Sequence, residues 1–172
     1  MIDVFQCLHR AKEKSKLLFV GDGELLTDAK SKVDKYGLRK DVIFTEARSD
    51  VEDLYCAMDY YIFPSTWEGF GISLIGAQAS GLPCLCSENI QEEAIVTDLA
   101  EQMDLGSRAY NWSRKIISMM DCYQRKDRVL DIKKAEFDIR CSTLKMQDFY
   151  LRISSRGKIS DNLCVRTYEV AA

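Results

Sequence analysis

The segment 64–72 (PSTWEGFGI) contains the residues with the clearest chemical potential in the chain. Glu68 offers a carboxylate that accepts hydrogen bonds from hydroxyl groups, such as those of a sugar. Gly69 and Gly71 stand directly before a predicted helix, whose free backbone N–H groups and positive dipole end favour an anion. The segment therefore indicates a site for a hydroxylated, anionic ligand. A capped, glycine-rich turn with a solvated glutamate would use the same residues, so spacing alone leaves both interpretations open.

Two more polar segments follow apolar runs in the same way. Gly21, Asp22 and Gly23 come directly after the run 17–20. Glycines at such a point let backbone N–H groups approach a ligand closely, although a tight turn needs the same residues. The dinucleotide-binding fingerprint is absent, because Leu26 stands where its third glycine would be. The segment 45–48 follows the run 42–44 and is a weaker candidate for ligand contact.

These polar segments belong to a chain in which apolar runs alternate with helical patterns. The runs 17–20, 42–44, 60–63, 84–86 and 94–96 predict strands, and apolar residues at helical spacing predict helices over 1–11, 26–36, 50–58 and 71–80. Such alternation is typical of a parallel sheet covered on both faces. The predicted fold class is α/β, a Rossmann-like doubly wound parallel sheet. Ligands of such sheets bind beyond the carboxyl ends of the strands, where the three polar segments lie.

Only helices are predicted after about residue 110. An apolar stripe at helical spacing predicts a helix packed on the core; it consists of Trp112, Ile116, Met119, Met120 and Tyr123. One or two further helices are predicted within 133–151. The expected organisation is a single domain over 1–152 with C-terminal helices, followed by a flexible polar tail over 153–172.

The composition argues against several classes of protein. The 172 residues carry 24 Lys and Arg against 27 Asp and Glu, a net charge of −3, which argues against nucleic-acid binding through bulk charge. The sequence has no membrane-spanning run and no secretion signal, so a soluble, cytoplasmic domain is expected. The seven cysteines lack zinc or thioredoxin-type spacing, which favours reduced thiols and no metal site. Cys84 and Cys86 are expected to share one face of a strand.

The segment 17–83 resembles the donor-binding, C-terminal domain of the retaining glycosyltransferases of the large "group 1" family, which have the GT-B fold. Bacterial transferases that build capsular, exopolysaccharide and lipopolysaccharide chains are the most similar members. The matching stretches, in the family's order and spacing, are 18–23 (LFVGDG), 42–44 (VIF), 57–59 (AMD), 63–65 (FPS), 67–71 (WEGFG) and 77–83 (AQASGLP). The stretch 137–139 (FDI) also resembles the family's closing helical segment.

This resemblance implies a function and a set of site residues. Family members bind a nucleotide-diphospho-sugar between two α/β domains and transfer the sugar with retained configuration, without a metal. The residues implied to bind the donor sugar and diphosphate are Glu68, Gly69, Phe70, Gly71 and Ile72, with Glu68 on the sugar hydroxyls. The residues implied to border the nucleoside are Gly21, Asp22, Gly23, Thr45 and Arg48. No cofactor is implied, and a UDP-sugar is the favoured substrate.

The chain departs from the family pattern at Gly76. The family's motif places a second glutamate, which holds the ribose hydroxyls, after Glu68 and seven further residues, and Gly76 stands there instead. A charged hydrogen-bond acceptor contributes about 1.5–3 kcal/mol, so its loss weakens donor binding by about ten- to a hundred-fold. Compensation by water or by a neighbour such as Gln78 is left open.

A second departure concerns the region before Met1. The arginine and lysine that grip the diphosphate in the family, and the N-terminal acceptor domain, would precede Met1. This chain is therefore expected to be a fragment that lacks the acceptor domain and is not a competent transferase alone. Apolar surface that this domain would cover predicts self-association. Membrane association, at the inner face in the full-length context, is expected to be peripheral at most.

Two functions follow as hypotheses. The leading one is the nucleotide-sugar-binding domain of a glycosyltransferase that transfers a hexose from a nucleotide-diphospho-sugar to a glycan or lipid-linked acceptor. The alternative is a degenerate relative that kept the fold and serves as a non-catalytic interaction module, which Gly76 favours. A receiver-type signalling domain is disfavoured, because clustered aspartates after the first strand and an aspartate ending the third are not in place.

Overall fold

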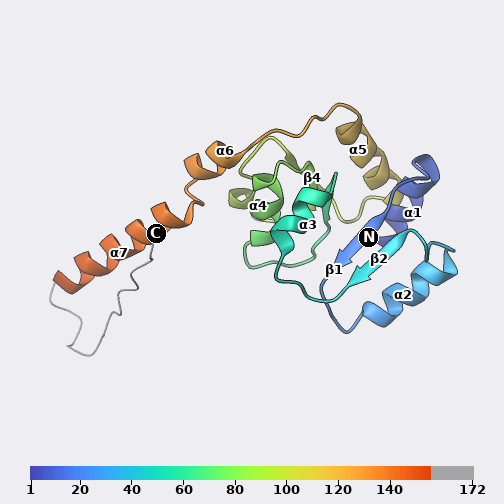
Figure 1. Ribbon diagram of the computed structural model, residues 1–172, viewed down its shortest axis with the longest axis horizontal. Helices are drawn as coiled ribbons and strands as arrows, with labels where there is room; N and C mark the ends of the chain where they lie inside the picture. Colours follow the sequence, from blue (N-terminus) through green and yellow to red (C-terminus); the bar gives the residue numbers. More distant parts are fainter. Residues whose placement is uncertain (156–172) are drawn as a thin grey trace. The chain divides into compact units, whose positions relative to one another are not determined.

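The computed structural model describes residues 1–155, drawn as coloured ribbons in Figure 1. The chain groups into two compact units, the first over Met1–Ile132 and the second beginning at Lys133. The tail predicted over 153–172 lies outside the described residues, except for 153–155, which belong to the last helix. None of the helices within 1–155 combines enough length with enough apolar character to cross a membrane.

The first unit alternates helices and strands in the predicted order. Its strands are β1 (Leu17–Val20), β2 (Val42–Thr45), β3 (Tyr61–Phe63), β4 (Cys84–Ser87) and β5 (Ala100–Met103). Its helices are α1 (Ile2–Ala11), α2 (Leu26–Lys35), α3 (Val51–Ala57), α4 (Ile72–Ala79), the 3₁₀ turn η1 (Glu92–Ala94), α5 (Ala109–Asp121) and α6 (Val129–Lys134), which reaches into the second unit. The second unit continues with α7 (Ile139–Ser155). Up to β4, the predicted ends of helices and strands lie within one residue of the observed ones.

The strand predicted over 94–96 is wrong. The backbone N–H groups of Val96 and Thr97 each donate to the side-chain oxygen of Gln78 at 3.0 Å, and the chain just before them forms η1. The last strand within 1–155 is β5 instead, although its sequence, AEQM, contains no apolar run. This strand forms because its backbone pairs in parallel with the fully buried β4.

The strands form two hydrogen-bonded parallel sheets. β1 pairs with β2 in the first sheet, and β4 lies between β3 and β5 in the second. A common hydrophobic core joins the sheets, since Leu85 of β4 packs in the same cluster as Leu17 of β1 and Val42 of β2. The predicted α/β class with parallel strands is therefore confirmed.

Strand β4 shows that helices cover both faces of its sheet. All of its residues are buried. Leu85 belongs to the core that includes α1 and α5, whereas Cys84 and Cys86 belong to a second core formed with α3 and α4. Desolvation raises the pKa of the Cys84 thiol far above its ordinary value and that of Cys86 to about 11. Both side chains are therefore neutral thiols that serve as small apolar core groups.

Helices α1 and α5 pack against each other on the first of these faces. Phe5 and Leu8 of α1 and Trp112 and Ile116 of α5 are buried in one cluster. The Trp112 indole N–H also donates to the carbonyl of Asp104 at 3.1 Å. The predicted role of the apolar stripe in core packing is confirmed for these α5 residues.

Candidate functional site

The polar segments singled out in the sequence lie at the carboxyl ends of the parallel strands. Val20 and Thr45 are register partners at the carboxyl ends of β1 and β2. The segments 21–23 and 45–48 therefore lie together at this end of the first sheet, which is here called the β1–β2 edge. In the second sheet, Phe63 pairs with Cys86 near the ends of β3 and β4. The segment 64–71, here called the Glu68 loop, therefore leaves the sheet beside the segment 88–91.

Glu68 is held within its loop by a neighbouring serine. The Ser65 hydroxyl lies 3.1 Å from Glu68 Oε1 and 3.0 Å from the carbonyl oxygen of Trp67, and its single proton serves one acceptor at a time. The Glu68 side chain is only partly buried. An ionised carboxylate has about four acceptor positions, so most of those of Glu68 remain for hydroxyl groups of a ligand.

Gly71 turns the Glu68 loop into α4. It is the N-cap of α4 with φ of 85°, a left-handed conformation that favours glycine. A Cβ at this position would lie 3.6–3.9 Å from side-chain atoms of Phe63, Ile90 and Ala94, so the turn is closely packed. The N–H groups of the following residues belong to the set that a helix leaves without internal partners. The end of α4 that meets the loop thus carries partial positive charge.

The glycine turn at the β1–β2 edge is open. Gly21 has φ of 125°, and no heavy atom lies within 4 Å of a Cβ built at Gly21 or Gly23. The Asp22 carboxylate accepts the backbone N–H of Gly23 at 2.7 Å, so the turn is braced by its own middle residue. A ligand can approach this backbone closely, but the Gly23 N–H is already engaged.

Thr45 and Arg48 complete the β1–β2 edge. The Thr45 hydroxyl donates to the carbonyl of Phe19 at 3.2 Å and so ties β2 to β1. Both Nε and Nη2 of the Arg48 guanidinium donate to the carboxylate of Asp50. These hydrogen bonds hold the pKa of the Asp50 carboxyl below its ordinary value. Arg48 is exposed, and a ligand anion would compete with Asp50 for it.

The space beside Gly76 is filled by an aromatic ring. A Cβ at Gly76 would lie 3.0 Å from Tyr55 Cε2, closer than such atoms normally approach. Tyr55 is buried, donates its hydroxyl to the carbonyl of Ser73 at 2.9 Å and packs edge-on against Tyr61. Burial raises the pKa of the Tyr55 phenol well above its ordinary value, so it stays neutral. Where the family pattern has a second glutamate, this protein has a neutral ring from α3.

The idea that Gln78 compensates for Gly76 is wrong. The Gln78 side chain is fully buried, and its amide nitrogen donates to the carbonyls of Leu74 and Ala94 at 3.2 and 2.7 Å. Its oxygen accepts the N–H groups of the chain after η1. The donor and acceptor groups of this amide are therefore used within the protein. Gln78 links α4 to the segment that follows η1 and has no group left to bind a ligand.

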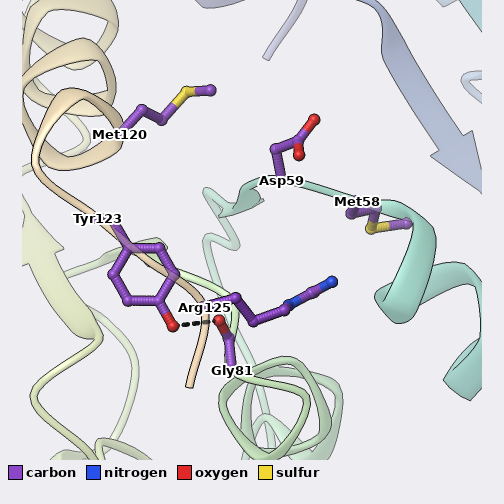
Figure 2. A pocket seen from close by; sticks show the side chains of 6 residues that line it. All are labelled: Met58, Asp59, Gly81, Met120, Tyr123 and Arg125. Carbon is purple, nitrogen blue, oxygen red and sulfur yellow. Dashed lines mark hydrogen bonds between the residues drawn. The ribbon is translucent and has the colours of Figure 1, made fainter. Parts of the chain in front are cut away.

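A pocket of about 240 Å³ lies elsewhere, at the amino ends of β3 and β4 (Figure 2). Its lining consists of Met58, Asp59, Gly81, Met120, Tyr123 and Arg125. Tyr123 donates its hydroxyl to the carbonyl of Gly81 at 2.6 Å, and Arg125 donates to the carbonyls of Tyr55 and Cys56, near the end of α3, at 2.7 Å each. These hydrogen bonds hold the segment after α5 against the end of α3 and the turn before β4. None of the predicted site residues lines the pocket.

Sequence reasoning missed the side chains that hold the Glu68 loop. Ser87 at the end of β4, and Asn89 and Gln91 just after it, donate hydrogen bonds to carbonyl groups of the loop. Their only signal in the sequence is a polar stretch after a buried strand, which gives no indication of the partner.

The fold and the site define a Rossmann-like α/β domain whose carboxyl edge carries a glutamate–glycine loop suited to a hydroxylated, anionic ligand. Residues 1–133 match the family model described as "Glycosyl transferases group 1", and the chain belongs to this family. The resemblance to the group 1 family inferred from the sequence is thereby confirmed.

Individual relatives match only part of their own length. EpsF of Bacillus subtilis (strain 168) is 35% identical over 78 residues, which are 45% of this chain and 20% of EpsF. The UDP-Gal:alpha-D-GlcNAc-diphosphoundecaprenol alpha-1,3-galactosyltransferase of Escherichia coli is 36% identical over 74 residues, which are 42% of this chain and 19% of that enzyme. The matched part therefore spans about a fifth of each of these relatives.

The fold also matches solved structures. The structure of Anabaena Alr3699/HepE in complex with UDP aligns with a TM-score of 0.71 at 18% identity, over 90% of this chain and 45% of that chain. At this identity the likeness shows the fold alone. It agrees with the parallel sheets and covering helices described above.

Proposed function

We propose that this chain is the nucleotide-sugar-binding domain of a glycosyltransferase that transfers a hexose from a nucleotide-diphospho-sugar to a glycan or lipid-linked acceptor. The observation that carries the proposal is the Glu68 loop: a serine-held carboxylate that leads through Gly71 into the positive end of α4. A UDP-sugar is the proposed donor. This choice is supported by the UDP-Gal in the name of the Escherichia coli relative and by the UDP in the HepE structure.

In this proposal the Glu68 loop binds the reactive half of the donor. Glu68 accepts hydrogen bonds from the sugar hydroxyls, and the backbone at Gly69, Phe70, Gly71 and Ile72 faces the sugar and diphosphate. The dipole of α4 and its first N–H groups stabilise the charge of the leaving diphosphate, which is electrostatic catalysis by a preorganised site.

The β1–β2 edge borders the nucleoside in the same proposal. Gly21, Asp22 and Gly23 give the nucleoside an open approach to the backbone, with Thr45 and Arg48 beside them. Because the neutral Tyr55 ring fills the space beside Gly76, the ribose is held without the family's second carboxylate. We therefore expect weaker donor binding than in a family member that has it.

Transfer is proposed for this domain together with an acceptor-binding domain. The resemblance implies that the donor lies between two α/β domains, and the matched part covers about a fifth of its relatives. The proposed location is the cytoplasm, peripherally at the inner membrane face where the acceptor is lipid-linked. The acceptor in the name of the Escherichia coli relative is such a lipid-linked sugar.

Self-association is a further part of the proposal. Within the second unit, α7 exposes several large apolar side chains, namely Ile139, Leu144, Met146, Phe149, Tyr150 and Leu151. Burial of such side chains against another chain would be favourable. Sedimentation at high protein concentration tests this, and a clean monomer would contradict it.

A non-catalytic interaction module is the second candidate function. The filled space beside Gly76 favours this candidate. A protein that no longer binds the donor can fill the position of the family's second glutamate with a core side chain such as Tyr55. The Glu68 loop and its helix end argue for retained binding.

Calorimetric titration separates the two candidates. UDP, GDP and their sugar conjugates are titrated into the unaltered chain and into the Glu68→Gln variant. Binding of one nucleotide family, weakened about ten-fold or more by Glu68→Gln, supports the donor site, because the variant loses a charged acceptor. The control is Glu13→Gln, which removes an exposed carboxylate after α1. No binding by the unaltered chain at millimolar ligand would favour the interaction module.

A further inference from the structure

Three side chains, one at the end of β4 and two just after it, donate hydrogen bonds to the backbone of the Glu68 loop. The segments that meet here are 22 or 23 residues apart in the sequence, so the contact is tertiary. The three hydrogen bonds run from Ser87 Oγ to the Ser65 carbonyl, from Asn89 Nδ2 to the Thr66 carbonyl at 3.1 Å, and from Gln91 Nε2 to the Gly69 carbonyl at 2.9 Å.

The segment that carries these donors is itself firmly anchored. Ile90 is buried in the second core and lies against Gly71, 3.7 Å from where a Cβ would be. Its carbonyl accepts the side-chain amide of Gln102 in β5 at 2.6 Å. The N–H of Glu88 donates to the carbonyl of Met103 at 3.1 Å. Asn89 and Gln91 therefore extend from a backbone that is fixed by the sheet.

Asn89 and Gln91 bond backbone carbonyl groups that precede and follow Glu68 in the sequence. A trans peptide is planar, so a bond to the carbonyl of Thr66 orients the Thr66–Trp67 peptide, and a bond to the carbonyl of Gly69 orients the Gly69–Phe70 peptide. Gly69 is exposed and would otherwise leave the backbone many conformations. Two oriented peptides thus define where the Glu68 carboxylate stands.

We propose that Asn89 and Gln91 are positioning residues that hold the Glu68 loop in its ligand-binding conformation. Both side chains are exposed, so their contribution is not to the core. The proposal that they order the loop rests on the contacts alone. Its consequence for donor binding rests on the proposed function of the domain.

The first test measures the loop without any ligand. Gln91→Met and Asn89→Leu keep the size of each side chain and remove the donor, separately and together. Backbone hydrogen exchange in 65–71 should become about three- to ten-fold faster in each variant and faster still in the double variant, with an unchanged melting temperature. Gln124→Met, at an exposed glutamine after α5, is the matched control and should leave this exchange unchanged. Unchanged exchange in the double variant would overturn the proposal.

The second test titrates UDP and UDP-sugars into the same variants. Affinity should fall about three- to ten-fold in each single variant, an effect that a purely structural role would not produce at constant melting temperature. Undiminished affinity despite faster exchange would overturn the positioning role. If the unaltered chain binds no nucleotide, the proposed function fails, while the exchange measurement still decides whether the two amides order the loop.

Discussion

The two halves of the candidate site are held in different ways. At the β1–β2 edge, the segments that follow the strands are braced locally: Asp22 bonds the next residue along the chain, and Arg48 bonds Asp50. The longer-range bond from Thr45 to Phe19 joins the two strands themselves. The Glu68 loop is braced from the end of β4 and the segment after it, 22 or 23 residues away. Local bonds can break and reform without disturbing the core, whereas the loop can move only if it detaches from the sheet. In the proposed function, the β1–β2 edge is thus the adaptable side for the nucleoside and the Glu68 loop the preorganised side for the reacting sugar.

The largest expected difference between the halves is in their glycines. Gly71→Ala should lower the free energy of unfolding by about 2 kcal/mol, because alanine resists the left-handed conformation of a closely packed N-cap. Gly21→Ala should lower it by less than about 1 kcal/mol, because the open turn can change its φ without meeting neighbours. Urea unfolding of both variants measures this. Equal losses would contradict the contrast between the two halves.

The next largest effect concerns the space beside Gly76. Gly76→Glu alone should destabilise the chain by about 1 kcal/mol, because overpacking against Tyr55 exceeds the helix-propensity gain from replacing glycine. UDP affinity should not rise in this single variant, since the ring must first move. The measurement combines urea unfolding with calorimetry.

The double variant Tyr55→Leu with Gly76→Glu sharpens the same prediction. With the ring removed, the new carboxylate has room, and UDP should bind about ten-fold more tightly than to Tyr55→Leu alone, which is the control. Tighter binding by Gly76→Glu alone, without loss of stability, would mean that Tyr55 does not obstruct this position.

The smallest expected effect is at Arg48. Asp50→Asn releases the guanidinium, so UDP affinity should rise about two-fold, as for other exposed charge pairs. Calorimetry at low and high salt measures the gain, which added salt should remove. A loss of affinity would show that Asp50 serves the ligand directly.

The same pair has a defined pH dependence. Arg48 lowers the pKa of the Asp50 carboxyl, so the ion pair stabilises the fold above the ordinary aspartate pKa and is lost as the pH falls through the lowered value. Between pH 5 and 8 the pair should therefore stay intact. A carboxyl NMR titration of Asp50 measures this, and a midpoint at or above the ordinary value would contradict the pairing.

Much of the fold could be predicted because its signals are local. The fully buried β4 is a short apolar run between turn residues, and the helix after Gly71 follows a glycine that its left-handed turn requires. Strand β5 could not be predicted from its sequence, because its four residues are half polar and only the neighbouring β4 makes it a strand. The sequence predicted the segments that form the candidate site. It did not predict the side chains, such as Asn89 and Gln91, that hydrogen-bond to these segments.

The sequence by itself determined the alternation of strands and helices, the family, and the position of Glu68 at a strand's carboxyl end. Only the tertiary structure decided that Tyr55 fills the space beside Gly76, that Gln78 is consumed inside the core, and that Asn89 and Gln91 hold the Glu68 loop. The physical reason is the range of each interaction. Periodicity and turn preferences act between near neighbours and leave a pattern in the sequence. A contact between distant residues depends on how whole elements pack, and no local pattern records it.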